Sequence, residues 1–177
     1  MKSLSESLFD KDLVEKDIMY HPKTKNELID CIKEQLDKQG SAADLNIIDV
    51  SKITDMNHLF INLDIRNIDI SEWDVSKVEN MNDMFFDCKN FNSDLSKWNV
   101  GKVEDMHNMF IDCHKFNCNL SKWDVSKVED MGYMFFNCIK FDSDLSKWDV
   151  RNVKNTDYMF FRCNSLKKIP SWYHEES

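Results

Sequence analysis

The chain has 177 residues and a formal net charge of −9, with 42% hydrophobic and 31% charged residues. This composition supports one packed domain rather than a disordered chain. The acidic balance argues against nucleic acid and against an anionic membrane surface as partners. Only three glycines and two prolines are present, so we expect Asn, Asp and Ser side chains to form most of the turns.

The first segment, residues 1–20, combines many charges with scattered apolar side chains: Leu4, Leu8, Phe9, Leu13 and Ile18. A disordered arm and a loose amphipathic helix both fit this pattern, and the two alternatives stay open. No apolar run approaches the ~20 residues that cross a bilayer, and the acidic start lacks the apolar core of a signal peptide. We therefore expect a cytoplasmic protein without membrane insertion.

The next segment, residues 21–44, is predicted to cap the N-terminal end of the domain with one helix. Thr24 and Glu27 fit a capping box, and Gly40 fits the left-handed position just past a helix C-terminus. An apolar stripe along this helix could cover the first repeat; its residues are Leu28, Ile29, Ile32 and Leu36.

Residues 45–169 contain five repeats of 25 residues without insertions. The interval is set by Trp73, Trp98, Trp123 and Trp148, and again by Cys88, Cys113, Cys138 and Cys163. A period of 25 is typical of leucine-rich-repeat-like solenoids, whereas propeller blades need roughly 40–45 residues. Residues 170–177 are predicted to form a C-terminal cap and acidic tail, in which we expect Trp172 and Tyr173 to cover the last repeat.

Each repeat is predicted to form one short strand and one short helix, which makes the fold an α/β repeat solenoid. The residues that fit an extended segment bending through a turn are Leu95, Trp98, Val100 and Val103. Those with the spacing of one helix face are Met81, Met84, Phe85 and Cys88. Those placed as helix N-caps are Asn80, Asp105 and Asp130. Because neither element buries its apolar side alone, the repeats must stack.

The repeat unit L-S-x-W-D-V-S-x-V-x-D-M-x-x-M-F-x-x-C-x-x-F-N-x-D resembles the short repeat of the BspA-like leucine-rich-repeat surface-protein family. The lead-in YHPKTKNEL…ADLNIIDVSKITDM is also similar to that family's N-terminal part, so the resemblance covers roughly residues 21–173. It implies a bacterial solenoid that binds proteins, often host matrix or surface components, at the cell surface. It supplies no catalytic motif. The resemblance therefore makes the cell surface the alternative to the cytoplasmic location that the sequence predicts.

The four aligned cysteines are predicted to be buried, free and without metal. Stacked thiols lie along a line, whereas zinc ligands converge on one point, and parallel Cβ atoms ~4.8 Å apart are too distant for a disulfide. Cys118 replaces the Ser93 and Ser143 of other repeats, so we expect it to be an exposed thiol. Cys113, His114 and Cys118 form at most a partial metal site, and a metal-dependent or redox protein is the third functional hypothesis.

Asp residues recur after each Trp and at the end of each repeat. Stacked carboxylates bind calcium in some repeat proteins, but Asn99 and Asn119 interrupt the two rows and Gly-rich calcium turns are absent. We therefore expect these side chains to form Asx turns. The five histidines do not recur, and neither a phosphate loop nor a nucleophile elbow is present. These absences predict a protein without enzymatic activity or a cofactor.

The expected function is non-enzymatic protein binding by a monomer, and the alternative is an intracellular structural or regulatory scaffold. The acidic balance predicts a neutral or basic partner protein. Apolar residues align at the seventeenth position of each repeat, and both an exposed stripe and a wide core explain them. From this row and the variable fourteenth position, the candidate partner-binding residues are Phe86, Asn108, Ile111, Tyr133, Phe136 and Tyr158.

Overall fold

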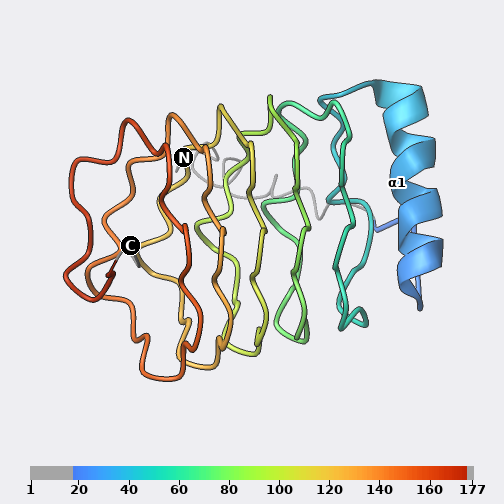
Figure 1. Ribbon diagram of the computed structural model, residues 1–177. Coiled ribbons are helices and arrows are strands. Elements are labelled where there is room, and N and C mark those ends of the chain that lie inside the picture. The colour runs from blue at the N-terminus through green and yellow to red at the C-terminus, as the bar shows by residue number, and fades with distance from the viewer. Residues whose placement is uncertain (1–17, 175–177) are drawn as a thin grey trace, which may run out of the picture.

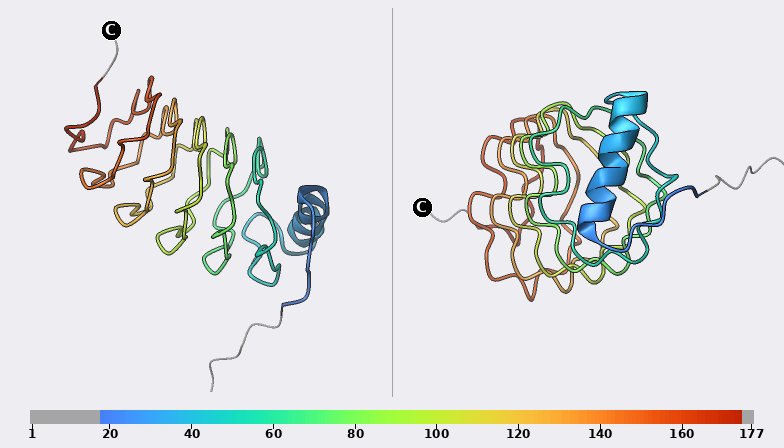
Figure 2. Two further views of the ribbon diagram at one scale, coloured as in Figure 1. Left: turned by 90° about the horizontal axis from the view of Figure 1, so that it is seen from below. Right: turned by 90° about the vertical axis from the view of Figure 1, so that its right-hand side faces the viewer.

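The computed structural model describes residues 18–174 as a row of stacked coils with one helix at the N-terminal end (Figure 1). Each repeat makes one coil, which gives coil 1 (45–69), coil 2 (70–94), coil 3 (95–119), coil 4 (120–144) and coil 5 (145–169). Figure 2 shows the coils following one another in one direction, with the helix lying across the outer side of coil 1. The two alternatives for the N-terminal arm, and the prediction of an acidic tail, concern mainly residues outside this range.

Helix α1 (Lys25–Gln39) confirms the capping helix that the sequence predicts. Thr24 is its N-cap, and its side-chain oxygen accepts a hydrogen bond from the N–H of Glu27 at 3.2 Å. At the other end Gly40 has φ 79° and donates its N–H to the carbonyl of Leu36 at 2.8 Å. The positive φ is a conformation that glycine adopts without steric cost. The buried side chains of α1 are Leu28, Ile32 and Gln35.

The predicted α/β solenoid, with one strand and one helix in each repeat, is wrong. Within residues 18–174, α1 is the only helix and no strand is formed. Single parallel β-bridges connect successive coils instead, as between Asp55 and Asn80 and between Asn80 and Asp105. The stack therefore consists of turns joined by bridges that are one residue long.

The segment predicted as a helix in each repeat forms tandem turns. In coil 2 the N–H groups of Met84, Phe86 and Cys88 each donate to the carbonyl three residues earlier, at 3.0–3.2 Å. Asp83 and Asp87 have φ values of 53° and 57°, which an α-helix cannot contain. The same left-handed backbone recurs twice in every coil, at His58, Asn62, Asp83, Asp87, Asn108, Asp112, Tyr133, Asn137, Tyr158 and Arg162.

Asx turns bend coils 1 to 4 at three further places and coil 5 at two, and they explain why no strand forms. In coil 3 the side-chain oxygens of Asn99, Asp105 and Asn119 accept hydrogen bonds from the N–H two residues ahead, at 3.2, 2.8 and 3.1 Å. The chain changes direction too often for a ladder longer than one residue. Asn80, Asp105 and Asp130 make such turns and are not helix N-caps, which corrects that prediction. The expectation of Asx turns is confirmed.

Aromatic rings fill the middle of the stack. The column Phe60, Phe85, Phe110, Phe135 and Phe160 has successive ring centroids 5.2–5.8 Å apart. A second column contains Phe91, Phe116 and Phe141, and each of these rings lies 4.1 Å from the Phe of the first column in its own coil. Fully burying one such ring contributes roughly 1.5–3 kcal/mol, so the columns hold adjacent coils together.

The recurring Trp and Cys side chains satisfy buried carbonyls of the preceding coil. Trp98 donates its Nε1–H to the carbonyl of Ile70 at 3.0 Å, and the thiol of Cys113 donates to the carbonyl of Phe85 at 3.0 Å. Equivalent bonds join the other coils. These carbonyls also accept a backbone N–H within their own coil, as the carbonyl of Ile70 does from Trp73 at 3.2 Å. The side chains therefore add a second hydrogen bond that clamps each coil to the preceding one. All six cysteines are unpaired.

Candidate functional site

The two rows that the sequence singled out lie together on the outer side of the tandem turns. At the seventeenth position Ile61, Phe86, Ile111 and Phe136 are half-buried and Phe161 is 37% exposed. The row is therefore a partly exposed stripe, and not part of the core that buries Phe85 and its equivalents. At the fourteenth position Asp83, Asn108 and Tyr133 are half-buried, and His58 and Tyr158 are exposed, Tyr158 to 47%.

Tyr133, Phe136, Tyr158 and Phe161 gather in coils 4 and 5 and form what we call the aromatic face. The Tyr133 and Tyr158 rings stack with centroids 5.2 Å apart, and the Phe136 and Phe161 rings stack at 5.1 Å. Within coil 4, Tyr133 lies 5.8 Å from Phe136. Within coil 5, Tyr158 meets Phe161 edge-on at 6.1 Å. The four side chains thus make one continuous apolar surface.

Charged and polar groups border the aromatic face. The His107 ring meets Tyr133 edge-on at 5.9 Å, and its Nδ1 lies 3.2 Å from Asp130. At the other end the guanidinium of Arg162 lies 5.4 Å above the centre of the Phe161 ring. An apolar centre with a polar rim is the usual arrangement of a protein-binding surface.

The backbone under the two tyrosines is unfavourable for such large side chains. Tyr133 has φ 56° and Tyr158 has φ 51°. Asn and Asp tolerate this left-handed region, whereas other residues lose roughly 1–2 kcal/mol there. The equivalent position holds Asp83 in coil 2 and Asn108 in coil 3. The tyrosines are therefore placed at a cost that coils 2 and 3 avoid, whereas coil 1 has His58 at this position with φ 57°.

Of the six candidate residues, the structure brings three into ring contact: Tyr133, Phe136 and Tyr158. Phe86, Asn108 and Ile111 lie in the same rows of coils 2 and 3, all half-buried. The candidate set lacked Phe161, although it stands in the seventeenth-position row, and it lacked Arg162 and His107. No sequence signal identified the last two, because neither residue type recurs at its position.

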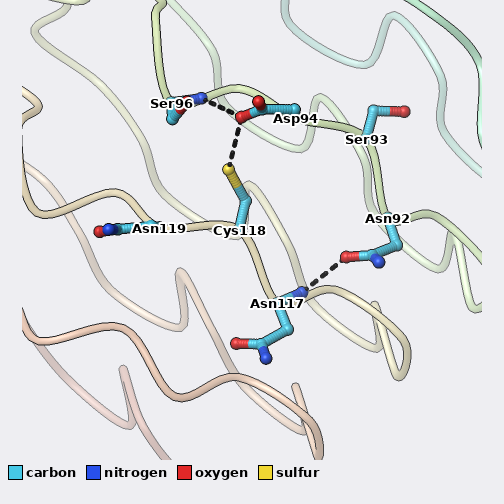
Figure 3. A pocket seen from close by; sticks show the side chains of 7 residues that line it. All are labelled: Asn92, Ser93, Asp94, Ser96, Asn117, Cys118 and Asn119. Atoms are coloured by element: carbon cyan, nitrogen blue, oxygen red, sulfur yellow. Dashed lines mark hydrogen bonds between the residues drawn. The ribbon is translucent and has the colours of Figure 1, made fainter.

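Cys118 lies in a different place and lines a small pocket of about 350 Å³ with Asn92, Ser93, Asp94, Ser96, Asn117 and Asn119 (Figure 3). The prediction of an exposed thiol is wrong, since Cys118 is only 8% exposed. Its sulfur accepts the N–H of Leu95 at 3.2 Å and donates to Asp94 at 3.5 Å. Burial raises the pKa of the Cys118 thiol to about 11, so the thiol is neutral and a poor nucleophile.

Among residues 18–174, no group of three or more His, Cys, Asp or Glu side chains could hold a metal ion. The proposed partial site at Cys113, His114 and Cys118 is thus not assembled: the Cys113 thiol points to the carbonyl of Phe85. No helix of that part of the chain has the length and apolar character to cross a membrane.

Comparison with known proteins places the chain in a family. No curated protein and no solved structure matches it. Two overlapping stretches, residues 32–121 and 101–177, each match the same protein family. Together the two matches span the second half of α1 and all five coils, and the chain belongs to the family described as "Mycoplasma protein of unknown function, DUF285".

Proposed function

We propose that the chain is a non-enzymatic protein-binding module that contacts its partner through the aromatic face. The observation that carries this proposal is the continuous, partly exposed apolar surface of Tyr133, Phe136, Tyr158 and Phe161. Contiguous exposed apolar patches rimmed by polar residues mark interaction sites. Tyr and Arg are also enriched among the residues that dominate binding energy.

The strained backbone of the two tyrosines supports the same proposal. A residue chosen for folding at the fourteenth position would be Asn or Asp, as in Asn108 and Asp83. The backbone at Tyr133 and Tyr158 costs stability, and the Tyr158 side chain is 47% exposed, so little burial compensates there. Functional sites commonly retain side chains that cost stability.

The resemblance of the repeat to the BspA-like surface proteins is consistent with this function. In that case the partner is a host matrix or surface protein, and the module acts at a bacterial cell surface. The half-buried residues Phe86 and Ile111 continue the apolar stripe into coils 2 and 3. An elongated partner could therefore extend its contact along the stack.

The test is affinity capture with three forms of the protein, applied to a matrix extract and to a lysate. Tyr133→Asn combined with Tyr158→Asn removes the rings and installs the residue that Asn108 shows to be compatible with this backbone. Lys97→Ser combined with Lys122→Ser is the control, because both lysines are exposed at another position of the repeat. We expect the lysine variant to capture the same protein as the wild type and the Asn variant to lose it. Equal capture by all three forms contradicts the proposal.

A further inference from the structure

The hydrogen bonds between coils run mainly in one direction along the tandem turns. In coil 2 four alternate N–H groups donate to carbonyls of coil 3 at 2.9–3.0 Å. The donors are Met81, Asp83, Phe85 and Asp87. Each of the other coils that is followed by a further coil repeats this pattern. The N–H groups of these positions therefore face the C-terminal end of the stack, and the carbonyls face the N-terminal end.

Coil 5 leaves its donors without acceptors. The equivalent positions are Thr156, Tyr158, Phe160 and Arg162, and we call their N–H groups the terminal N–H row. Among residues 18–174 none of these four groups makes a hydrogen bond. Trp172 and Tyr173 pack on the ring of Phe160, as expected for a C-terminal cap, with centroids 6.3 and 5.0 Å away. They cover the aromatic core and leave the row unbonded.

The opposite end of the stack is covered. Helix α1 lies across coil 1 in both views of Figure 2, and Lys25 reaches Asp55 at 2.9 Å and the carbonyl of Asn57 at 3.5 Å. A second copy therefore cannot place its first coil on the terminal N–H row. Two copies that met through their C-terminal ends would place donors against donors. The polarity of the stack thus favours a segment of another protein as the occupant.

The charge of coil 5 selects an acidic segment. Residues 145–169 contain six Lys or Arg and two Asp, a net charge of +4, and the tail adds Glu175 and Glu176, which leaves +2 for residues 145–177 in a chain with a net charge of −9. Three of these lysines pair with acidic residues of coil 4, namely Lys154, Lys167 and Lys168. Arg162 makes no ion pair among the described residues and lies beside the terminal N–H row, above Phe161. Unbonded N–H groups add partial positive charge at this end.

We infer that the C-terminal end of the stack binds an extended, acidic segment of a partner protein. Its backbone carbonyls accept hydrogen bonds from the terminal N–H row, its carboxylates approach Arg162, and its apolar side chains contact Tyr158 and Phe161. Addition of a segment to an open edge gives affinity through the main chain and selectivity through the side chains. The inference rests on the proposed function and supplies the chemistry of the partner, which the net charge of the whole chain had predicted to be neutral or basic.

Amide hydrogen exchange on the whole ¹⁵N-labelled protein tests this inference. The probe is an end-blocked peptide of alternating glutamate and leucine, and the control probe has lysine in place of glutamate. We expect the acidic peptide to slow exchange at Tyr158, Phe160 and Arg162 by on the order of tenfold or more. The equivalent amides Tyr133, Phe135 and Asn137 already donate to coil 5 at 2.7–3.0 Å and serve as internal controls that stay unchanged.

A pair of variants separates the charge of Arg162 from the general charge of coil 5. Arg162→Asn suits the positive φ, as Asn137 does in coil 4, and it should weaken peptide binding about twofold to fivefold. Arg151→Asn removes the same charge from coil 5 where Arg151 pairs with Asp149, and it should leave binding unchanged. Equal effects of the two variants would contradict the selective role of Arg162.

Three results overturn the inference. These are unchanged exchange with the acidic peptide, equal slowing by the basic peptide, and slowing by higher protein concentration alone, which would make a second copy the occupant. If the variant with Tyr133→Asn and Tyr158→Asn loses the captured partner and any of these three results is also found, only this inference is rejected. The proposed function then stands. Retained capture in that variant rejects the proposed function.

Discussion

The rings of Tyr133 and Tyr158 stack with centroids 5.2 Å apart, and both residues have a backbone φ between 51° and 56°. Two large side chains thus stand on adjacent coils in a conformation that suits Asn or Asp. The ring contact offsets part of this cost, because an aromatic pair contributes about 0.5–1.5 kcal/mol. Because Tyr158 is 47% exposed, the ring contact offsets less of the backbone cost there than it would at a buried position.

Tyr158→Asn should therefore keep or raise the stability of the fold. Relief of the left-handed strain gives up to roughly 1–2 kcal/mol, and the lost contact of an exposed ring subtracts less than that. Urea unfolding followed by circular dichroism measures the difference. Tyr158→Phe is the control, since it keeps both the ring and the strain and should match the wild type. A variant with Asn at this position that is less stable by more than about 1 kcal/mol would show that the ring has a structural role.

Trp123→Phe tests the clamps between coils. The indole Nε1–H of Trp123 donates to the buried carbonyl of Leu95 at 3.0 Å. Phenylalanine keeps an aromatic ring but removes this bond, and the Leu95 carbonyl then retains only the N–H of Trp98 at 3.1 Å. Loss of one such hydrogen bond costs about 0.5–1.5 kcal/mol. Thermal unfolding should show a melting temperature lower by several degrees. The same change at Trp172, which is only half-buried, serves as the comparison and should cost less. Equal losses at both positions would contradict the clamp.

Thiol reactivity should distinguish Cys31 from the other five cysteines. Cys31 on α1 is half-buried, and the other five are buried. Burial raises the pKa of Cys118 to about 11 and the pKa of Cys88 and of Cys163 to about 12. At pH 8 Ellman's reagent should modify Cys31 first in the folded protein and all six thiols after unfolding. Cys31→Ser should remove the fast phase, whereas rapid modification of Cys118 would contradict its position in the structure.

The Asx turns should make the fold sensitive to acid. Hydrogen bonds from Ser76, Ser96 and Ser126 lower the pKa of Asp74, Asp94 and Asp124, respectively, below the ordinary value of 3.8. A carboxyl with a lower pKa in the folded state stabilises the fold above its unfolded pKa, and this stabilisation is lost as the pH falls through the folded pKa. The free energy of unfolding should therefore decrease below about pH 4.

Replacing these three aspartates by Asn isolates their effect. Asn99 forms the same turn with Gly101 at 3.2 Å, so the triple variant should fold and be nearly as stable as the wild type at pH 7. Its stability should change less between pH 7 and pH 3. Asp105 acts in the opposite direction, because burial raises its pKa, but it is present in both proteins. Identical acid dependence of the two proteins would show that the turns do not titrate as described.

The sequence predicted the 25-residue period, the capping helix and the buried positions, but not the backbone of the repeat. Met81, Met84, Phe85 and Cys88 are all buried, as one helix face would be. Tandem turns bury residues at the same spacing, and the positive φ values at Asp83 and Asp87 distinguish them from an α-helix. Propensity could have suggested this, since Asn and Asp favour the left-handed region, but the tyrosines at the same position concealed it.

The prediction that the Cys118 thiol is exposed was wrong for a related reason. Ser at the equivalent position suggested a surface loop, yet Ser93 and Ser143 are buried. Ser93 donates to the carbonyl of Ile68 in the preceding coil, and Ser143 accepts the N–H of Leu120 at the start of its own coil. Part of the candidate surface followed from aligning the repeats. The clustering of rings in coils 4 and 5 and the direction of the bonds between coils depend on geometry that no alignment of repeats contains.

Photo-crosslinking most directly tests the central claim that the aromatic face binds a protein. A benzophenone amino acid replaces Phe161 in one protein and the exposed Lys97 in another, so that the reporter lies either on the aromatic face or away from it. Both proteins are irradiated with the partner recovered by affinity capture, and the products are identified by mass spectrometry. We predict a crosslinked partner from position 161 and none from position 97. Crosslinking from position 97 alone, or equally from both, would contradict the claim.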